Sequence, residues 1–213
     1  MIKNLLSKIN AKYPLSPIDA GEFSSLKVNG MKFSIEAYEA TGLGHVSIMR
    51  AKGFFGLMKM DTLMIVPKEV DLPLYSYDRI FAMGNDTLIV ELYNTQTAEL
   101  DLSSLDKVKA EFSDITERDP GVHWYDNIKL PQSISKKGKK KDTPKLDELA
   151  EKHFDAYISA PAAAVNDFGK KLALSSDYVN GLVENGGPST DVFKKSLGIE
   201  KTATLFKKVL FGV

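Results

Sequence analysis

The stretch VPKEVDLPLYSYDRIF, from Val66 to Phe81, links two apolar runs of the chain. The first run ends at Pro67, because proline cannot donate to a sheet ladder and marks the end or edge of a strand. A charged turn and Leu72-Pro73-Leu74 follow, and a Tyr-Ser-Tyr triplet then leads to Asp78, where the next run begins. Asp78 is either an ordinary turn carboxylate, capping the turn or paired with Arg79 or a lysine, or a carboxyl group that faces a ligand.

Apolar residues around this stretch recur at every second position, which is typical of strands. One alternating run surrounds Phe33, and four further candidate strands occupy residues 45–52, 57–66, 78–83 and 87–93. The links between them are short and rich in glycine, and none has room for a crossover helix, so we expect an antiparallel meander. Several strands are apolar on both faces, which indicates that both faces of the sheet are covered.

Helical spacing dominates the two ends of the chain. Stripes of apolar residues at intervals of three and four predict helices over 2–13, 102–112, 146–157, 165–172, 190–197 and 205–210. One helix before the strands and several after them indicate an α+β protein, a three-layer α/β/α sandwich with a central antiparallel β-sheet. A chain of 213 residues can form this as a single domain, residues 1–213.

Residues 117–144 show neither period and are expected to form a long irregular loop. The loop holds the only tryptophan and a basic cluster of Lys136, Lys137, Lys139, Lys140 and Lys141. The cluster is either a docking site for an acidic electron-transfer protein or a solvated mobile surface. A nucleic-acid partner is not expected, because the formal net charge is zero and no aromatic residues interleave the lysines.

Composition excludes several classes of site. The chain has no cysteine, which excludes disulfides, thiolate metal sites and a cysteine nucleophile, and its three histidines are too far apart in sequence to suggest a metal site. Phosphate-loop, metalloprotease and serine-hydrolase motifs are absent. No apolar run is long enough to span a membrane and the N-terminus does not look like a signal peptide. We therefore expect a soluble cytoplasmic protein with no membrane partner.

Two groups of motifs resemble those of the ferredoxin-dependent bilin reductases, which reduce open-chain tetrapyrroles. The first is Ile65-Val66-Pro67, then Leu72-Pro73-Leu74, then Asp78; the second is Tyr178, Asn185, a helix closing on Gly198, and Val209-Leu210-Phe211. The resemblance covers about residues 31–95 and 145–213. It implies a linear tetrapyrrole as substrate, electrons from an external ferredoxin or flavodoxin, and no cofactor bound by the protein itself.

The resemblance also assigns roles, with Asp78 as the proton donor. Aspartate suits this role, because desolvation raises the pKa of a carboxyl group until it holds a proton near neutral pH. His45 either replaces a histidine that the family places beside the aspartate or lies at a turn edge. The remaining candidates contact substrate or, alternatively, are ordinary core, edge or loop-anchoring residues: Arg50, Lys52 and Lys59 for the propionates, Met60 and Tyr77 for the rings, and Trp124 as part of a lid over the pocket.

Three departures from the family pattern favour an alternative. The family histidine falls at Asp61 or Thr62, an upstream carboxylate at Met49 or Arg50, and a C-terminal aspartate at Gly187. None of these positions keeps the group that the family uses. A non-catalytic tetrapyrrole-binding or carrier protein on the same fold is therefore the second hypothesis.

Overall fold

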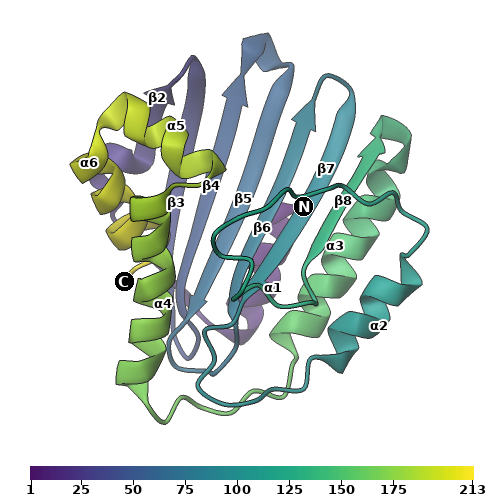
Figure 1. Cartoon of the computed structure of the whole chain (residues 1–213), viewed down its shortest axis with the longest axis vertical. Coiled ribbons are helices and arrows are strands. Elements are labelled where there is room, and N and C mark those ends of the chain that lie inside the picture. Colours follow the sequence, from purple (N-terminus) through teal and green to yellow (C-terminus); the bar gives the residue numbers. More distant parts are fainter.

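The computed structural model describes residues 1–213 except for the side chain of Pro188, and a large antiparallel sheet forms its centre (Figure 1). The strands in spatial order are β1 (Leu15–Ile18), β3 (Met31–Ala40), β4 (Gly44–Gly53), β5 (Met58–Pro67), β6 (Leu74–Ala82), β7 (Asn85–Tyr93) and β8 (Ile134–Lys139). A further short strand, β2 (Ser25–Val28), also pairs with β3. All pairings are antiparallel, as the short links predict.

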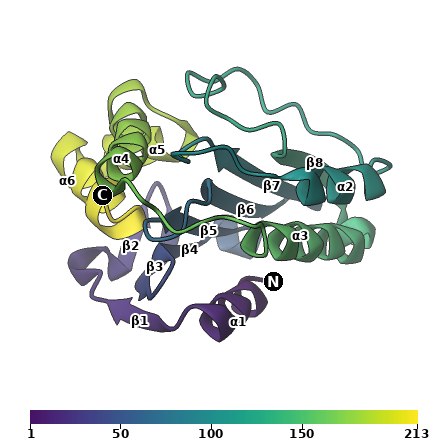
Figure 2. The same ribbon diagram turned by 90° about the horizontal axis from the view of Figure 1, so that it is seen from below.

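Helices cover both faces of the sheet. The helices are α1 (Ile2–Lys12), α2 (Ser103–Glu111), α3 (Thr143–Ile158), α4 (Phe168–Asn185), α5 (Pro188–Leu197) and α6 (Ile199–Thr204), followed by a π-helical turn, Leu205–Leu210. Buried residues of α1, α2 and α3 form one hydrophobic core with the sheet, and those of α4, α5 and the π-helical turn form a second. In Figure 2, α1 lies on one side of the strands and α4 and α5 on the other. The three-layer α/β/α sandwich predicted from the sequence is confirmed.

Strand β6 begins four residues earlier than the sequence suggests, at Leu74. Successive side chains of a strand point to opposite faces. Tyr75 and Tyr77 are therefore directed into the core beneath α1 and α3, whereas Asp78 faces the layer of α4. The immediate sequence neighbours of Asp78 thus do not surround its carboxyl group.

The expected irregular loop over residues 117–144 is wrong in its second half. Residues 134–139 form the edge strand β8, which pairs with β7, and a short 3-10 turn, Lys140–Asp142, leads directly into α3. Lysines are common on edge strands, where their charges oppose pairing with another chain. The strand escapes detection in the sequence because only Ile134 supplies an apolar residue to its pattern.

Candidate functional site

A cleft of about 370 Å³ separates the sheet from the second helical layer. This volume lies within the range of small-molecule sites, roughly 300–1,000 Å³. Its floor is formed by side chains of β3 to β7, and its roof by α4, α5, the C-terminal segment and the loop before β8. The lining includes Met49, Met58, Met60, Thr62, Met64, Ser76, Asp78, Glu91, Arg118, His123, Tyr125, Tyr178, Phe193 and Phe211. The lining is largely apolar with a few polar groups.

Asp78 lies on the floor of the cleft, directly opposite Thr62 on the neighbouring strand. The Thr62 hydroxyl donates a hydrogen bond to Oδ1 of Asp78. Burial raises the pKa of the Asp78 carboxyl to about 6, the Thr62 hydrogen bond opposes this rise, and the nearby negative charge of Glu91 adds to it. Asp78 as a residue is only partly buried, and it lines the cleft. It can therefore hold or release a proton near neutral pH where a ligand would lie.

A second carboxylate, Glu91, lines the same cleft. Glu91 lies opposite Ser76, two residue pairs farther along β7 than Ile89, the partner of Asp78. The Tyr93 hydroxyl donates to its Oε2 at 2.6 Å, and Lys129 Nζ lies 3.8 Å from its Oε1. Glu91 is a site residue that was not predicted, although the alternation along β7 places it on the opposite face from Leu88, Val90 and Leu92.

Arg118 is a cationic residue of the cleft that the sequence analysis missed. Its Nη1 donates only a long hydrogen bond, 3.4 Å, to Ser135 Oγ, and its backbone N–H donates to the Ser135 carbonyl at 2.9 Å. No carboxylate of the described residues lies within ion-pair distance of its guanidinium. The residue belongs to an irregular segment, so no periodic pattern in the sequence indicates its direction.

The basic residues expected to bind propionates face away from the cleft. Lys52 pairs with Lys59 across β4 and β5, and Arg50 pairs with Asp61, whereas Met49 and Met60, which adjoin Arg50 and Lys59, line the cleft. Arg50 instead contacts Glu36 through Nη1 and Oε1 at 2.5 Å. Side chains alternate along a strand, so residues next to cleft-lining positions must face the other side. The prediction that Arg50, Lys52 and Lys59 bind the propionates is therefore wrong.

Tyr77, expected to contact the rings, also lies on the opposite face of the sheet. It is fully buried in the core that α1, α2 and α3 form with the sheet. Burial raises the pKa of its hydroxyl well above the usual range, so the hydroxyl stays protonated. Met60, in contrast, lines the cleft together with Met58 and Met64.

His45 does not line the cleft, and it lies opposite Val66 of β5, whereas Asp78 lies opposite Thr62. Its Nε2 lies 2.8 Å from the Val209 carbonyl, and its ring packs against Gly212 so closely that an added Cβ there would come within 2.5 Å. Burial lowers its pKa to about 4, which keeps the ring neutral. His45 thus fastens the C-terminal segment to β4 and does not replace the missing family histidine.

Trp124 holds the loop before β8 against α4. Its Nε1 donates to the Gly186 carbonyl at 2.9 Å, and its ring lies over Gly181, where a Cβ would approach within 2.2 Å. The neighbouring Tyr125 enters the cleft and meets Tyr178 edge to face, with ring centroids 6.0 Å apart. The tryptophan anchors a loop, and that loop forms part of the cleft roof.

Four of the five clustered lysines are exposed: Lys137, Lys139, Lys140 and Lys141. Lys136 is different, since its side chain is only 3% exposed. Its Nζ donates to the Ile115 carbonyl at 3.2 Å and to Glu117 Oε1 at 2.5 Å. Lys136 therefore cannot contribute to partner docking, which corrects that part of the expectation.

The described part of the chain contains no group of three or more histidine, aspartate or glutamate side chains placed to hold a metal ion. Among the helices described, none is both long and apolar enough to cross a membrane.

Comparison with known proteins identifies the fold. No protein-family model matches the chain, and no curated protein matches its sequence. A solved structure does match: phytochromobilin synthase from tomato in complex with biliverdin, with a TM-score of 0.80 and 15% sequence identity. The match covers 99% of this chain and 81% of the tomato chain. At this identity the likeness shows a shared fold, and it confirms the bilin-reductase architecture that the sequence motifs implied.

Proposed function

We propose that this protein reduces a linear tetrapyrrole, with Asp78 as the proton donor and an external ferredoxin or flavodoxin as the electron donor. One observation carries the proposal: a carboxyl group with a pKa of about 6 faces an apolar cleft of about 370 Å³. The solved protein with the same fold holds biliverdin, which supports the choice of ligand.

The reaction adds two electrons and two protons across one double bond of the bilin. The donor protein gives the electrons one at a time and is oxidised. Asp78 gives one proton to the ring system, and the second comes from solvent. Its carboxylate then recovers a proton from water at the cleft mouth, which a pKa near the working pH makes efficient.

The cleft offers complementary contacts for such a ligand. The methionines of β4 and β5 give a flexible, polarizable floor suited to a flat conjugated molecule. Arg118 is the residue we assign to a propionate, because guanidinium binds carboxylates in a two-pronged geometry. It replaces Arg50, Lys52 and Lys59 in that role.

The exposed lysines of β8 and of the 3-10 turn before α3 are the docking site that we propose for the electron donor. Lys137, Lys139, Lys140 and Lys141 lie together in sequence and are solvent-exposed. Ferredoxins and flavodoxins are acidic, so we expect association to weaken as salt concentration rises.

Binding and turnover can be measured separately. The purified protein is mixed with biliverdin, and a shifted absorption band reports binding; reduced ferredoxin is then added, and consumption of the band reports reduction. We expect both in the wild type and in Asp61→Asn, a control on the opposite sheet face. Asp78→Asn should bind biliverdin but consume it at least 100-fold more slowly. Absence of any shifted band would contradict the proposal.

A non-catalytic bilin carrier is the second candidate. The observation that favours it is that Thr62, not a histidine, contacts Asp78, and that Met49, not a carboxylate, lies opposite Thr62. The site then holds fewer proton-transferring groups than the family pattern. A stable biliverdin band that reduced ferredoxin leaves unchanged would select the carrier.

A further inference from the structure

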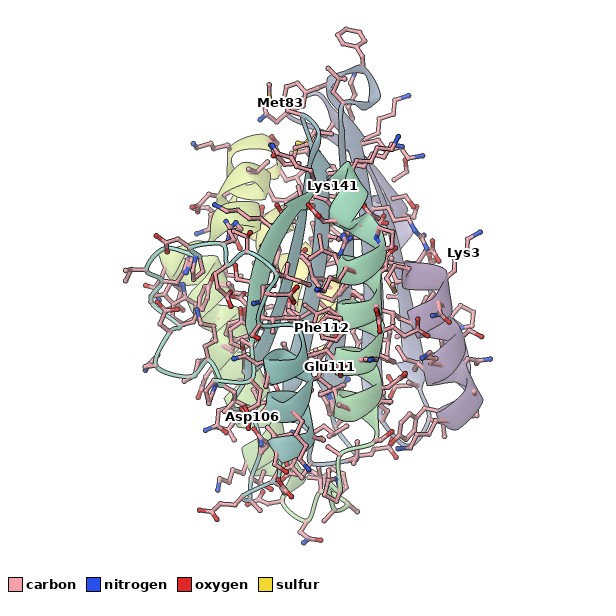
Figure 3. The ribbon with its side chains drawn as sticks, turned by 90° about the vertical axis from the view of Figure 1, so that its right-hand side faces the viewer. Lys3, Met83, Asp106, Glu111, Phe112 and Lys141 are labelled. Carbon is pink, nitrogen blue, oxygen red and sulfur yellow. The ribbon has the colours of Figure 1, made fainter. Side chains whose placement is uncertain are left out.

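Two neighbouring turns at one end of the sheet expose large apolar side chains. The turn between β4 and β5 carries Phe54, Phe55 and Leu57, which are 59%, 109% and 69% exposed, and the turn between β6 and β7 carries Met83, 88% exposed. The two turns are joined, because the Met83 N–H donates to the Leu57 carbonyl at 3.4 Å. Figure 3 shows Met83 near the extreme end of the molecule, beyond Lys141.

The backbone at these turns is strained. Phe54, Phe55 and Met83 all have positive φ values of 50°, 55° and 51°. Bulky residues rarely adopt this left-handed conformation, and strain of this kind concentrates at functional sites. The left-handed backbone conformation therefore adds a free-energy cost to that of exposing these apolar side chains to water.

A row of lysines crosses the sheet just behind the turns. Lys27, Lys32, Lys52 and Lys59 lie directly opposite one another on β2, β3, β4 and β5, on the sheet face away from the cleft. All four are exposed, and none has an ion-pair partner among the described residues. Like charges in direct register destabilise a sheet, so an anionic surface placed against this row removes a repulsion.

The spacing of the two features matches a membrane interface. Lys52 precedes Phe54 by two residue steps and its partner Lys59 follows Leu57 by two, a distance along each strand of roughly 7 Å at about 3.3 Å per step. Interfacial anchors bury apolar groups about 5–10 Å deep while basic residues remain at headgroup level. The aromatic turn would therefore reach the acyl boundary as the lysines meet phosphate groups.

We propose that this end of the sheet docks on an anionic lipid surface. The absence of a membrane-spanning helix among the described segments does not bear on peripheral docking of this kind. An acidic protein is the rival partner, but the turns beside this row project strongly exposed apolar side chains, which suit the acyl boundary of a bilayer. Protruding turns also suit a deformable bilayer. The proposal is independent of bilin reduction.

Vesicle sedimentation tests the proposal. The full chain is spun with vesicles of phosphatidylcholine alone or mixed with phosphatidylserine. We expect binding only to the anionic vesicles, weakened by salt. Phe54→Ser with Phe55→Ser should lower the partition coefficient at least tenfold. A matched control, Phe168→Ser with Leu172→Ser on α4, removes two other exposed apolar residues and should leave it unchanged.

The charge contribution is tested in the same assay. Lys52→Gln with Lys59→Gln should weaken binding on the order of tenfold or more, at about fivefold per lysine. Lys3→Gln with Lys107→Gln, exposed lysines of α1 and α2, serves as the control. The proposal would be overturned by an equal loss of vesicle binding in both lysine pairs or by no binding to anionic vesicles. It would also be overturned if Phe54 and Phe55 supported binding only to an acidic protein such as ferredoxin. All the residues changed are exposed, and circular dichroism checks that each variant is folded.

Discussion

At the residue scale, Asp78 is held in a state that opposes its ionisation. Burial raises its folded-state pKa to about 6, above the 3.8 of an ordinary aspartate. Above pH 6 the folded protein therefore carries a charge that its surroundings disfavour. Between pH 6 and about 4 the folded state binds more protons than the unfolded state, so this penalty decreases as pH falls.

Asp78→Asn should accordingly stabilise the protein in alkaline solution. We expect its free energy of unfolding at pH 8 to exceed that of the wild type by on the order of 2 kcal/mol, with the difference shrinking as pH falls from 6 toward 4. Urea denaturation at several pH values measures it. Asp61→Asn, on the opposite face of the sheet, should show no gain. A stability loss for Asp78→Asn at pH 8 would contradict the description of this carboxyl group.

Gly181 is a second residue with a specific requirement. The Trp124 ring occupies the space where a side chain would begin, 2.2 Å from an ideal Cβ. Gly181→Ala should displace Trp124 and break its hydrogen bond to Gly186, which shifts the fluorescence of the single tryptophan to longer wavelength. Gly169→Ala in the same helix meets only an ordinary contact at 3.5 Å and should leave the spectrum unchanged. Identical spectra for both variants would show that the loop is not anchored in this way.

At the element scale, a buried ion pair between β6 and β7 also contacts the start of helix α3. Arg79 of β6 contacts Asp86 of β7 through Nε and Oδ1 at 2.6 Å and through Nη2 and Oδ2 at 2.8 Å. The hydroxyl of Thr143, the first residue of α3, donates to the same Asp86 carboxylate at 2.6 Å. Both members of the pair are at most 2% exposed.

Asp86→Ala should be strongly destabilising, because it leaves a buried guanidinium without its main partner. We expect a loss of about 3 kcal/mol in the free energy of unfolding. Asp147→Ala removes the more exposed carboxylate that lies 3.3 Å from Arg79 and should cost less than about 1 kcal/mol. Equal losses in urea denaturation would show that the buried pair does not hold α3.

Strands with alternating apolar residues were predictable from the sequence, and the edge strand was not. Successive residues of β3, β4, β5 and β7 point to opposite faces of the sheet, both of which are largely covered. Apolar residues at every second position of the sequence indicate these strands. Strand β8 carries lysines and a glycine at most of its positions, so nothing in its pattern distinguishes it from a basic loop. Its pairing depends on β7, which lies more than 40 residues earlier and offers a free edge.

The candidate site was predictable in part, and one error in predicting its residues was avoidable. Asp78 and Met60 line the cleft as expected. However, Lys59 adjoins Met60, and Tyr77 adjoins Asp78, and adjacent residues of one strand cannot share a face. Arg118 and the Trp124 contact could not be foreseen, because irregular segments acquire their direction from tertiary packing alone.

At the scale of the whole molecule, buried titratable groups set the response to acid. Burial lowers the pKa of His45 and of His153 to about 4, from 6.5 when unfolded. Below pH 6.5 the unfolded chain binds up to two more protons at these sites than the folded protein does. The free energy of unfolding therefore decreases as the pH decreases. Asp78 acts in the opposite direction between pH 6 and 4, which leaves a net excess of about one proton for the unfolded state.

The free energy of unfolding should therefore decrease by on the order of 3 kcal/mol from pH 7 to pH 4.5. Urea denaturation across this interval measures the slope. Replacing both histidines by glutamine, which can keep a hydrogen bond to the Val209 and Gln132 carbonyls, should remove the decrease or reverse its sign. A wild-type protein of constant stability over this range would show that the histidines are not held neutral by the fold.

The sandwich as a whole places one proton-donating carboxyl group on the floor of a ligand cleft, and single-turnover reduction tests that arrangement most directly. Biliverdin is bound to the wild type and to Asp78→Asn, reduced ferredoxin is added at pH 7, and the absorption of the bound bilin is followed. We predict consumption by the wild type and a rate at least 100-fold lower in the variant, with biliverdin affinity changed by less than about threefold. Equal rates in the two proteins would contradict the role of Asp78.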